Sequence, residues 1–509
     1  MTGLVDKTRL VDKTLLVGFE EPDPPEWFRR AAPGLGGVVL YGQNLRVDTD
    51  AARLASVLHQ DSDVVLAVDE EGGDVTRVHY RNGSPVPGNY VLGAADDEGL
   101  TGAVATRIGV GLRAAGIGWN LAPDVDVNSA PENPVIGVRS FGADPDTVSR
   151  HAATWVLAME NTGVAACAKH FPGHGDTRSD SHYGLPVVDC DEAEWRRVHL
   201  PPFVAAIDVG VRSIMTAHVV VPALDDQPAT MSRRMLTDIL RGELGYQGVI
   251  VTDALDMGAI KNGVGLGAGA VAALRAGADA LCLGAIGGEG LYQEVRSAVL
   301  AAVDDGALPL RRLEEAAERV EALLTWVRNA PPPQPGPAGR AAAGAGGLAA
   351  AAPGAASPDA FDPGMEAARR AARVFGDPVV SGPPVIVELR ATPNLAVGEA
   401  YWDLAAPLAE RGLAPRAVHR LTDATSLSEV LTAVEGQPLV VVGRDVPRHP
   451  WQQKAWHVLS GRCPDAVLVE LGLPCPDVLT TGQRVFVGGA GRPNLQVAAE
   501  LLSGDRHRP

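Results

Sequence analysis

Between residues 36 and 327, short apolar runs alternate with Ala-rich stretches of helical character, and this alternation constrains the fold more than any other feature. The runs lack the polar alternation of a half-exposed strand, which is typical of parallel strands buried on both faces. Helical stretches follow most runs, for example 145–161 and 288–303. Repeated β–α units over about 300 residues predict an α/β fold, a (β/α)8 TIM-like barrel or a close variant. The expected strands are 37–41, 64–68, 118–122, 165–168, 213–217, 248–252 and 278–283.

Polar side chains come directly after the expected strands. They are Asp69, Asp124, Lys169, His218 and Asp253. The catalytic face of a barrel is built from side chains at the carboxyl ends of several strands. An open doubly wound sheet would instead gather its polar groups at one switch point. The distribution therefore favours a closed barrel.

The composition changes near residue 330. Residues 330–363 are mostly Pro, Gly and Ala, which bury little and are typical of a linker. Beyond it, a helical stretch at 366–375 precedes strand-like runs at 385–389, 439–443, 466–470 and 484–488. We therefore predict a barrel domain at 1–329, a linker at 330–364 and a smaller αβα sandwich domain at 365–509.

Charge and composition exclude several classes of partner. The net charge of −18 disfavours nucleic acid and anionic membrane surfaces. No apolar run reaches the roughly 20 residues of a membrane span, and the amino terminus lacks the layout of a secretory signal. The five cysteines have no tight spacing, which indicates reduced thiols. We predict a cytoplasmic protein with no nucleic-acid or membrane partner, and the oligomeric state stays open.

Residues 169–182 place several titratable side chains on a Gly-rich loop just past the strand 165–168. Such loops commonly hold reactive side chains at the rim of a rigid scaffold. In Asp180-Ser181-His182, the carboxylate is spaced to orient a histidine that moves protons. By residue chemistry alone, His174 in the same loop is an equally good candidate.

This loop resembles the signature of family 3 glycoside hydrolases of the β-N-acetylglucosaminidase type. Four further stretches match that family in order, over about the first two thirds of the chain: 69–73 with Arg77, 133–141, His218 and 251–257. The resemblance implies that Asp253 is the nucleophile and that His182, oriented by Asp180, is the general acid/base. It implies a sugar site made of Asp69, Arg77, Arg139, Lys169 and His170. Glu70 departs from the glutamine more usual in this subfamily and would add charge near Arg77.

The residue types are compatible with these roles and with simpler ones. A carboxylate at a strand tip, such as Asp253, suits nucleophilic attack, but it can also cap the following helix. Arg77 and Arg139 suit sugar hydroxyls, and they can equally form structural ion pairs with Asp69 or Asp124. His218 fits a sugar contact and a hydrogen-bonded core histidine about equally well.

The resulting expectation is a retaining β-N-acetylglucosaminidase that needs no cofactor and no metal. It would hydrolyse terminal β-linked N-acetylglucosamine, from muropeptide or cell-wall fragments, through a covalent glycosyl-aspartate. The alternatives are a β-N-acetylglucosaminide phosphorylase, a β-glucosidase of the same family and, less favoured, a metal-dependent hydrolase. The last would use His170, His174, His182, Asp176 and Asp180, but Pro172 and two glycines disfavour the helix that such spacing needs.

Overall fold

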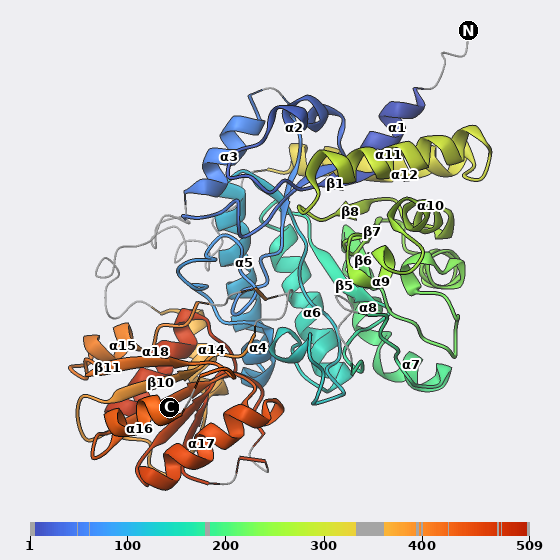
Figure 1. Cartoon of the computed structure of the whole chain (residues 1–509). Coiled ribbons are helices and arrows are strands. Elements are labelled where there is room, and N and C mark those ends of the chain that lie inside the picture. Colours follow the sequence, from blue (N-terminus) through green and yellow to red (C-terminus); the bar gives the residue numbers. More distant parts are fainter. Residues whose placement is uncertain are drawn as a thin grey trace.

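Figure 1 shows a computed structural model in which an amino-terminal barrel is followed by a smaller carboxy-terminal layered unit. The structure describes residues 6–47, 49–60, 62–178, 184–331, 361–392, 397–398, 401–425, 427–475, 478–479 and 481–505. Two predicted features lie outside the described residues. They are most of the linker, from 332 to 360, and the Asp180–His182 pair.

Among the described residues, eight parallel strands form the first unit. Five are paired in the order β4-β3-β2-β1-β8, and three in the order β5-β6-β7. Parallel bridges from Trp119 to Ala165 and from Val251 to Ala280 join the two groups, so the ring closes. The strands are β1 Leu15–Val17, β2 Gly37–Leu40, β3 Leu66–Val68, β4 Ile117–Asn120, β5 Cys167–Phe171, β6 Ser213–Thr216, β7 Val249–Thr252 and β8 Leu281–Leu283. The predicted barrel is confirmed, with β1 as an additional strand before the seven expected ones.

Helices surround the ring, and the two predicted from 145 and 288 are α6 and α11. Asp144 begins α6 by accepting a hydrogen bond from the Thr147 amide, and Pro145 occupies the first turn, where no amide donor is needed. The helices are α1 Lys7–Lys13, α2 Glu26–Ala31, η1 Ala32–Gly34, α3 Asp50–Leu58, α4 Asn89–Ala95, α5 Glu98–Ala114, η2 Gly137–Arg139, α6 Pro145–Glu160, α7 Glu192–Val198, α8 Pro201–Asp208, η3 Ala229–Met231, η4 Arg234–Glu243, α9 Gly258–Lys261, α10 Leu266–Ala276, α11 Gly288–Asp304 and α12 Leu310–Asn329.

The last of these helices, α12, closes the amino-terminal end of the barrel. Its buried side chains, including Leu324 and Val327, share one apolar cluster with inward-facing strand residues such as Trp119 and Cys167. A Cβ on Gly118, at the start of β4, would clash with Val327, so this close approach requires glycine. Because this end is filled, the cavity of the barrel lies at the carboxyl ends of the strands.

The second unit is a six-stranded sheet ordered β11-β10-β12-β13-β14-β9, parallel except for the edge strand β9. One apolar cluster packs the sheet against α15 and α18, and another packs it against α16 and α17. The predicted αβα sandwich is therefore confirmed. Its elements are α14 Pro363–Ala371, β9 Arg373–Phe375, β10 Val385–Leu389, α15 Ala405–Glu410, β11 Ala417–Leu421, α16 Ser428–Val434, β12 Leu439–Gly443, η5 Val446–Arg448, α17 Pro450–Arg462, β13 Val467–Glu470, β14 Gln483–Phe486 and α18 Arg492–Ser503.

The two units are in direct contact. Helix α14 packs on α4 and α5 of the barrel and on α18 of the sandwich. Ion pairs cross the boundary, from Arg370 to Asp97 and from Arg444 to Asp74. Within the described part of the chain, no helix is both long and apolar enough to cross a membrane.

Candidate active site

A cavity of about 380 Å³ lies at the carboxyl ends of the barrel strands. Its size is within the range of sites for small ligands. Strands β3, β5 and β7 each bring a polar residue to its wall, because parallel strands present their carboxyl ends at the same rim. The predicted site residues that line it are Asp69, Arg77, Arg139, Lys169, His170 and Asp253.

A network of alternating charges forms one wall of the cavity. Lys169 Nζ lies 2.6 Å from Asp69 Oδ1 and 2.8 Å from Glu71 Oε1. Arg139 binds both oxygens of Glu71, at 2.8 and 3.0 Å. Burial alone would raise the pKa of Glu71, but Arg139 and Lys169 outweigh it and hold that pKa well below its usual range. Four charged side chains therefore lie fixed beside the cavity.

Asp69 differs from the other members of this network in its exposure. Its side chain is 20% exposed, whereas those of Lys169 and Glu71 are each 2% exposed. Lys169 satisfies only part of its carboxylate, since each carboxylate offers about four acceptor sites. Asp69 therefore retains acceptor capacity for hydroxyl groups of a bound ligand.

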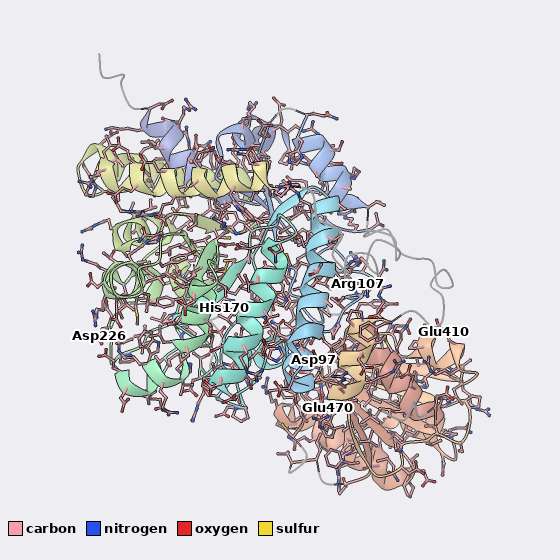
Figure 2. All side chains as sticks on the ribbon, turned by 180° about the vertical axis from the view of Figure 1, so that it is seen from behind. Asp97, Arg107, His170, Asp226, Glu410 and Glu470 are labelled. Atoms are coloured by element: carbon pink, nitrogen blue, oxygen red, sulfur yellow. The ribbon has the colours of Figure 1, made fainter. Side chains whose placement is uncertain are left out.

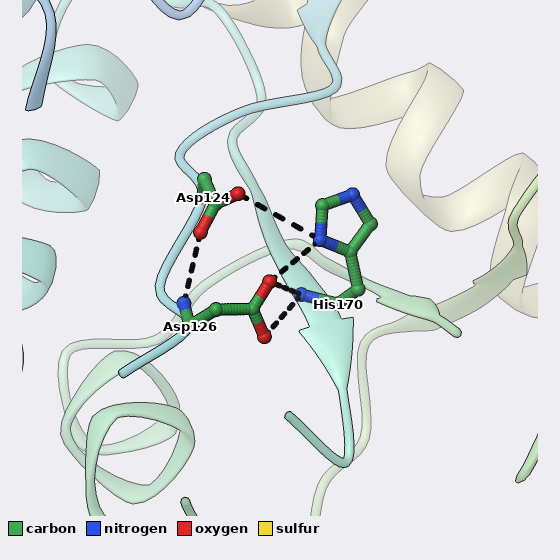
Figure 3. A group of neighbouring side chains, drawn as sticks. All are labelled: Asp124, Asp126 and His170. Carbon is green, nitrogen blue, oxygen red and sulfur yellow. Dashed lines mark hydrogen bonds and ion pairs between the residues drawn. The ribbon is translucent and has the colours of Figure 1, made fainter. Parts of the chain in front are cut away.

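Two buried aspartates lie on the Nδ1 side of the His170 ring (Figure 3). Asp126 Oδ2 lies 2.8 Å from His170 Nδ1, and Asp124 Oδ2 lies 3.8 Å from the same atom. Since Nδ1 donates to Asp126, the unprotonated Nε2 faces Arg139 Nη2 at 3.4 Å. Burial first, and then the charge of Arg139, lower the pKa of His170 to about 4. His170 is thus a neutral imidazole in the wall of the cavity, and Figure 2 marks its place within the barrel unit.

His174 also lines the cavity and is held by its neighbours. Its backbone amide donates to Asp126 Oδ1 at 2.7 Å, and its ring Nδ1 lies 2.7 Å from Thr177 Oγ1. Burial lowers the pKa of His174 to about 4, and the charge of Asp126 offsets this only in part. A histidine with this pKa is unprotonated near neutral pH and is a poor proton donor there.

Asp124, Asp126 and His170 offer three potential metal-ligand atoms within 4.8 Å of one another. The surrounding chemistry does not fit a cation, because the Arg139 guanidinium lies 3.5 Å from Asp124 Oδ2. Burial, and then the charge of Asp126, also raise the pKa of Asp124 to about 7, so one carboxyl of the pair is readily protonated. These residues fit a hydrogen-bonded support for His170 better than they fit a metal centre.

Asp253 sits at the tip of β7 on the cavity wall and is partly buried. Its Oδ1 accepts a hydrogen bond from the Ala254 amide at 2.8 Å. Asp256 is not among the lining residues of the cavity and accepts a hydrogen bond from the Gly284 amide at 3.0 Å. His218 is fully buried, and its ring nitrogens lie 2.9 Å from Thr230 Oγ1 and 3.0 Å from the Ala254 carbonyl oxygen. His218 therefore supports the turn that carries Asp253.

The turn after β3 brings Arg77 to the cavity. Gly72 and Gly73 adopt positive φ values of 87° and 57°, which a side chain would disfavour. Buried Glu70 accepts hydrogen bonds from the amides of Arg77 and Val78, at 2.9 and 3.0 Å. Burial raises the pKa of Glu70. Glu70 therefore organises the turn through its backbone amides.

Comparison with known proteins shows the family. Residues 29–323 match the model of the glycosyl hydrolase family 3 N terminal domain. The chain belongs to glycosyl hydrolase family 3. The family therefore confirms an enzyme that acts on glycosides, as the sequence predicted.

Two curated relatives of this family 3 enzyme are named β-hexosaminidases. β-Hexosaminidase A of Pseudoalteromonas piscicida is 41% identical over 251 residues, which are 45% of this chain and 42% of that protein. The chain thus matches less than half the length of that relative. The β-hexosaminidase of Chromobacterium violaceum is 36% identical over 320 residues, which are 60% of this chain and 79% of that protein.

A solved structure extends the likeness to both units of this family 3 chain. The family 3 β-N-acetylglucosaminidase from Paenibacillus sp. str. FPU-7 superposes with a TM-score of 0.83 at 30% identity. The match covers 99% of this chain and 97% of that one. The likeness therefore includes the sandwich as well as the barrel.

Two parts of the site were not predicted from the sequence. Glu71 is the common partner of Lys169 and Arg139, and only its position beside Asp69 in the motif singles it out. Gly398, from the second unit, lines the cavity, and Val397 lies beside it with its carbonyl oxygen 3.4 Å from Arg77 Nη1. No local sequence signal connects residue 398 with the barrel.

Proposed function

We propose that this protein is a retaining β-N-acetylglucosaminidase that hydrolyses terminal β-linked N-acetylglucosamine. The observation that carries the proposal is the placement of Asp253 in one cavity with the Asp69–Lys169–Glu71–Arg139 network. The relatives named β-hexosaminidase and the likeness to a β-N-acetylglucosaminidase along nearly the whole chain support the choice of sugar.

The sugar is recognised by directional hydrogen bonds. Asp69 accepts from sugar hydroxyls, and Arg77, Arg139 and Lys169 donate to hydroxyl or acetamido oxygens. His170 is held neutral, and its Nε2 can accept a hydrogen bond from a sugar hydroxyl that competes with Arg139 Nη2 for this nitrogen. Because the hydrogen bond from Nδ1 to Asp126 fixes the ring of His170, this acceptor needs little reorganisation when the sugar binds.

The reaction proceeds by double displacement. An Asp253 carboxylate oxygen attacks the anomeric carbon, the glycosidic C–O bond breaks, and His182 gives its proton to the departing oxygen. The neutral His182 then takes a proton from water, the water oxygen attacks the anomeric carbon, and the ester bond to Asp253 breaks. Asp180 orients His182 throughout. The low pKa of His174 supports this assignment over the competing histidine.

The proposal extends to the substrate source and to the acceptor. The sequence resemblance favours muropeptide or cell-wall fragments in the cytoplasm. Water is favoured over phosphate as the acceptor, since the charges of Lys169 and Arg139 are already matched by Asp69 and Glu71. An anion therefore gains little attraction from this pair of cations.

A panel of nitrophenyl β-glycosides, run in phosphate and in a phosphate-free buffer, tests the proposal. We expect the N-acetylglucosaminide to be cleaved with a kcat/KM at least about tenfold above the glucoside. Free N-acetylglucosamine should be the product in both buffers. A glucoside cleaved as fast would point to a β-glucosidase, and sugar 1-phosphate to a phosphorylase. Unchanged activity after treatment with a chelator would support metal-free catalysis.

A further inference from the structure

A turn of the second unit, residues 444–448 after β12, contacts two separate loops of the barrel. One is the loop after β3, which carries Arg77, and the other is the loop after β4, which carries Arg139. Each loop brings one guanidinium group to the cavity. The turn is therefore placed to influence the substrate site without lining it.

The first contact is an ion pair with a buried partner. Arg444 Nη2 lies 2.7 Å from Asp74 Oδ2, and the Asp74 side chain is 1% exposed. The amide of Ala490, also in the second unit, donates to Asp74 Oδ1 at 2.5 Å. Asp74 lies three residues before Arg77 and directly after Gly72 and Gly73, which both have positive φ. A buried carboxylate needs such partners, so the second unit fixes this loop.

The second contact reaches the loop after β4. Arg448 Nη2 donates to the carbonyl oxygen of Pro131 at 2.7 Å. Its guanidinium also lies beside Gly137, since a Cβ there would be 3.9 Å from both terminal nitrogens. Gly137 begins η2, the short helical turn that ends at Arg139. Arg448 therefore braces the segment that presents Arg139.

The turn itself is held rigid from within the sandwich. Glu470, at the end of β13, is fully buried. Its carboxylate accepts hydrogen bonds from the amides of Asp445, Val446 and Gly472, at 2.7, 3.0 and 2.6 Å. These bonds stabilise Asp445 in a left-handed conformation with φ of 54°, which is uncommon for a residue with a side chain. Figure 2 shows Glu470 on the barrel-facing side of the second unit. The contacts to Asp445 and Val446 hold the backbone of the turn between Arg444 and Arg448.

We propose that the turn 444–448 is a two-armed brace that positions Arg77 and Arg139 for the sugar. Arg444 and Arg448 are positioning residues, and the second unit sets the affinity of the site without supplying a reacting group. The inference rests on the proposed sugar contacts of Arg77 and Arg139. It goes further by assigning a role in substrate binding to the second unit.

The test compares Arg444→Gln with the native full-length chain, using whichever nitrophenyl β-glycoside the native enzyme cleaves best. Without the Arg444 contact the loop that carries Arg77 is less well fixed, which weakens binding of the substrate and of the transition state equally. We therefore expect KM to rise about tenfold, with kcat unchanged within about twofold. Arg444→Lys, which keeps the charge, should recover part of the loss. Hydrogen exchange of the amides at 70–78, measured without substrate, should accelerate in Arg444→Gln. This readout stays valid for any sugar, so it separates failure of the brace from failure of the proposed function.

Arg370→Gln is the matched control, because it removes another ion pair between the same two units, with Asp97, away from the cavity. It should leave KM and the exchange at 70–78 unchanged. Arg448→Gln is a second, milder variant, whose effect should appear in the exchange of 130–139. Equal changes in Arg370→Gln and Arg444→Gln would overturn the brace in favour of general docking. Native KM and native exchange rates in both Arg444→Gln and Arg448→Gln would overturn it as well.

Discussion

Asp126 fixes the ring of His170, with Asp126 Oδ2 2.8 Å from His170 Nδ1 in the interior of the barrel. The same carboxylate also accepts a hydrogen bond from the backbone amide of His174. One aspartate thus sets the tautomer of one cavity histidine and the backbone position of the other. The acceptor character of His170 Nε2 follows from this pairing.

Replacing Asp126 by Asn should therefore disturb the site more than the fold. The amide can donate to Nδ1, which moves the His170 proton to Nε2 and removes the acceptor that faces Arg139 at the cavity wall. We expect kcat/KM to fall by roughly 10²-fold, and the ¹⁵N signals of His170 should report the changed tautomer. Asp238→Asn, at a half-exposed position on η4, is the control and should leave kcat/KM and the His170 tautomer unchanged. An unchanged tautomer in an active variant would contradict this account.

Asp253 is predicted to carry the covalent intermediate. Asp253→Asn should lose on the order of 10³-fold or more in kcat, because a neutral amide is a poor nucleophile. A 2-fluoro sugar with a good leaving group should label the native protein at Asp253, as mass spectrometry of peptides would show. Asp256→Asn is the matched control, since Asp256 bonds to the Gly284 amide outside the cavity lining. Labelling at Asp256 or at a glutamate would reject the assignment.

His182 is predicted to protonate the leaving group. His182→Ala should slow substrates with poor leaving groups far more than activated aryl glycosides, which need little protonation. Asp180→Asn should act in the same direction but more mildly. The measurement is the slope of log kcat/KM against leaving-group pKa, for the native protein and both variants. If the native protein and both variants give the same slope, His182 is not the proton donor. A steeper slope in a His174 variant would then assign this role to His174.

Glu160 is predicted to make stability depend on pH. Burial raises its pKa from the ordinary 4.5 to about 7, despite hydrogen bonds from the amides of Arg212 and Ala166. Between these values the folded chain binds the proton and the unfolded chain does not, so stability is lost as pH rises through this window. The free energy of unfolding should therefore fall relative to that of Glu160→Gln by at most roughly 3 kcal/mol from pH 4.5 to 7. Urea unfolding of both proteins across the range measures it, and a constant difference would contradict the shift.

Much of the barrel could be predicted because its signal is local. The apolar runs at 37–41 and 248–252 became β2 and β7, and the helical stretch from 145 became α6. The short strand β1 was not predicted, since three apolar residues beside an amphipathic helix do not stand out as a strand. The family resemblance predicted Asp69, Lys169 and Asp253 as residues of one site, and all three line the same cavity. Their catalytic and binding roles, and the domain boundaries near 330 and 365, stay predictions.

The sequence by itself determined which residue types stand at the ends of the strands, because strand burial and motif spacing are properties of short segments. Only the tertiary structure decided how those side chains pair. Glu71 meets Arg139 and Lys169 from distant parts of the chain, and Asp74 meets Arg444 across the boundary between the two units. In the folded chain a buried charge pairs with an opposite charge that lies close to it, because an unpaired buried charge would be strongly destabilising. These pairings form only when the barrel closes and the sandwich packs against it, and no short sequence pattern predicts either step.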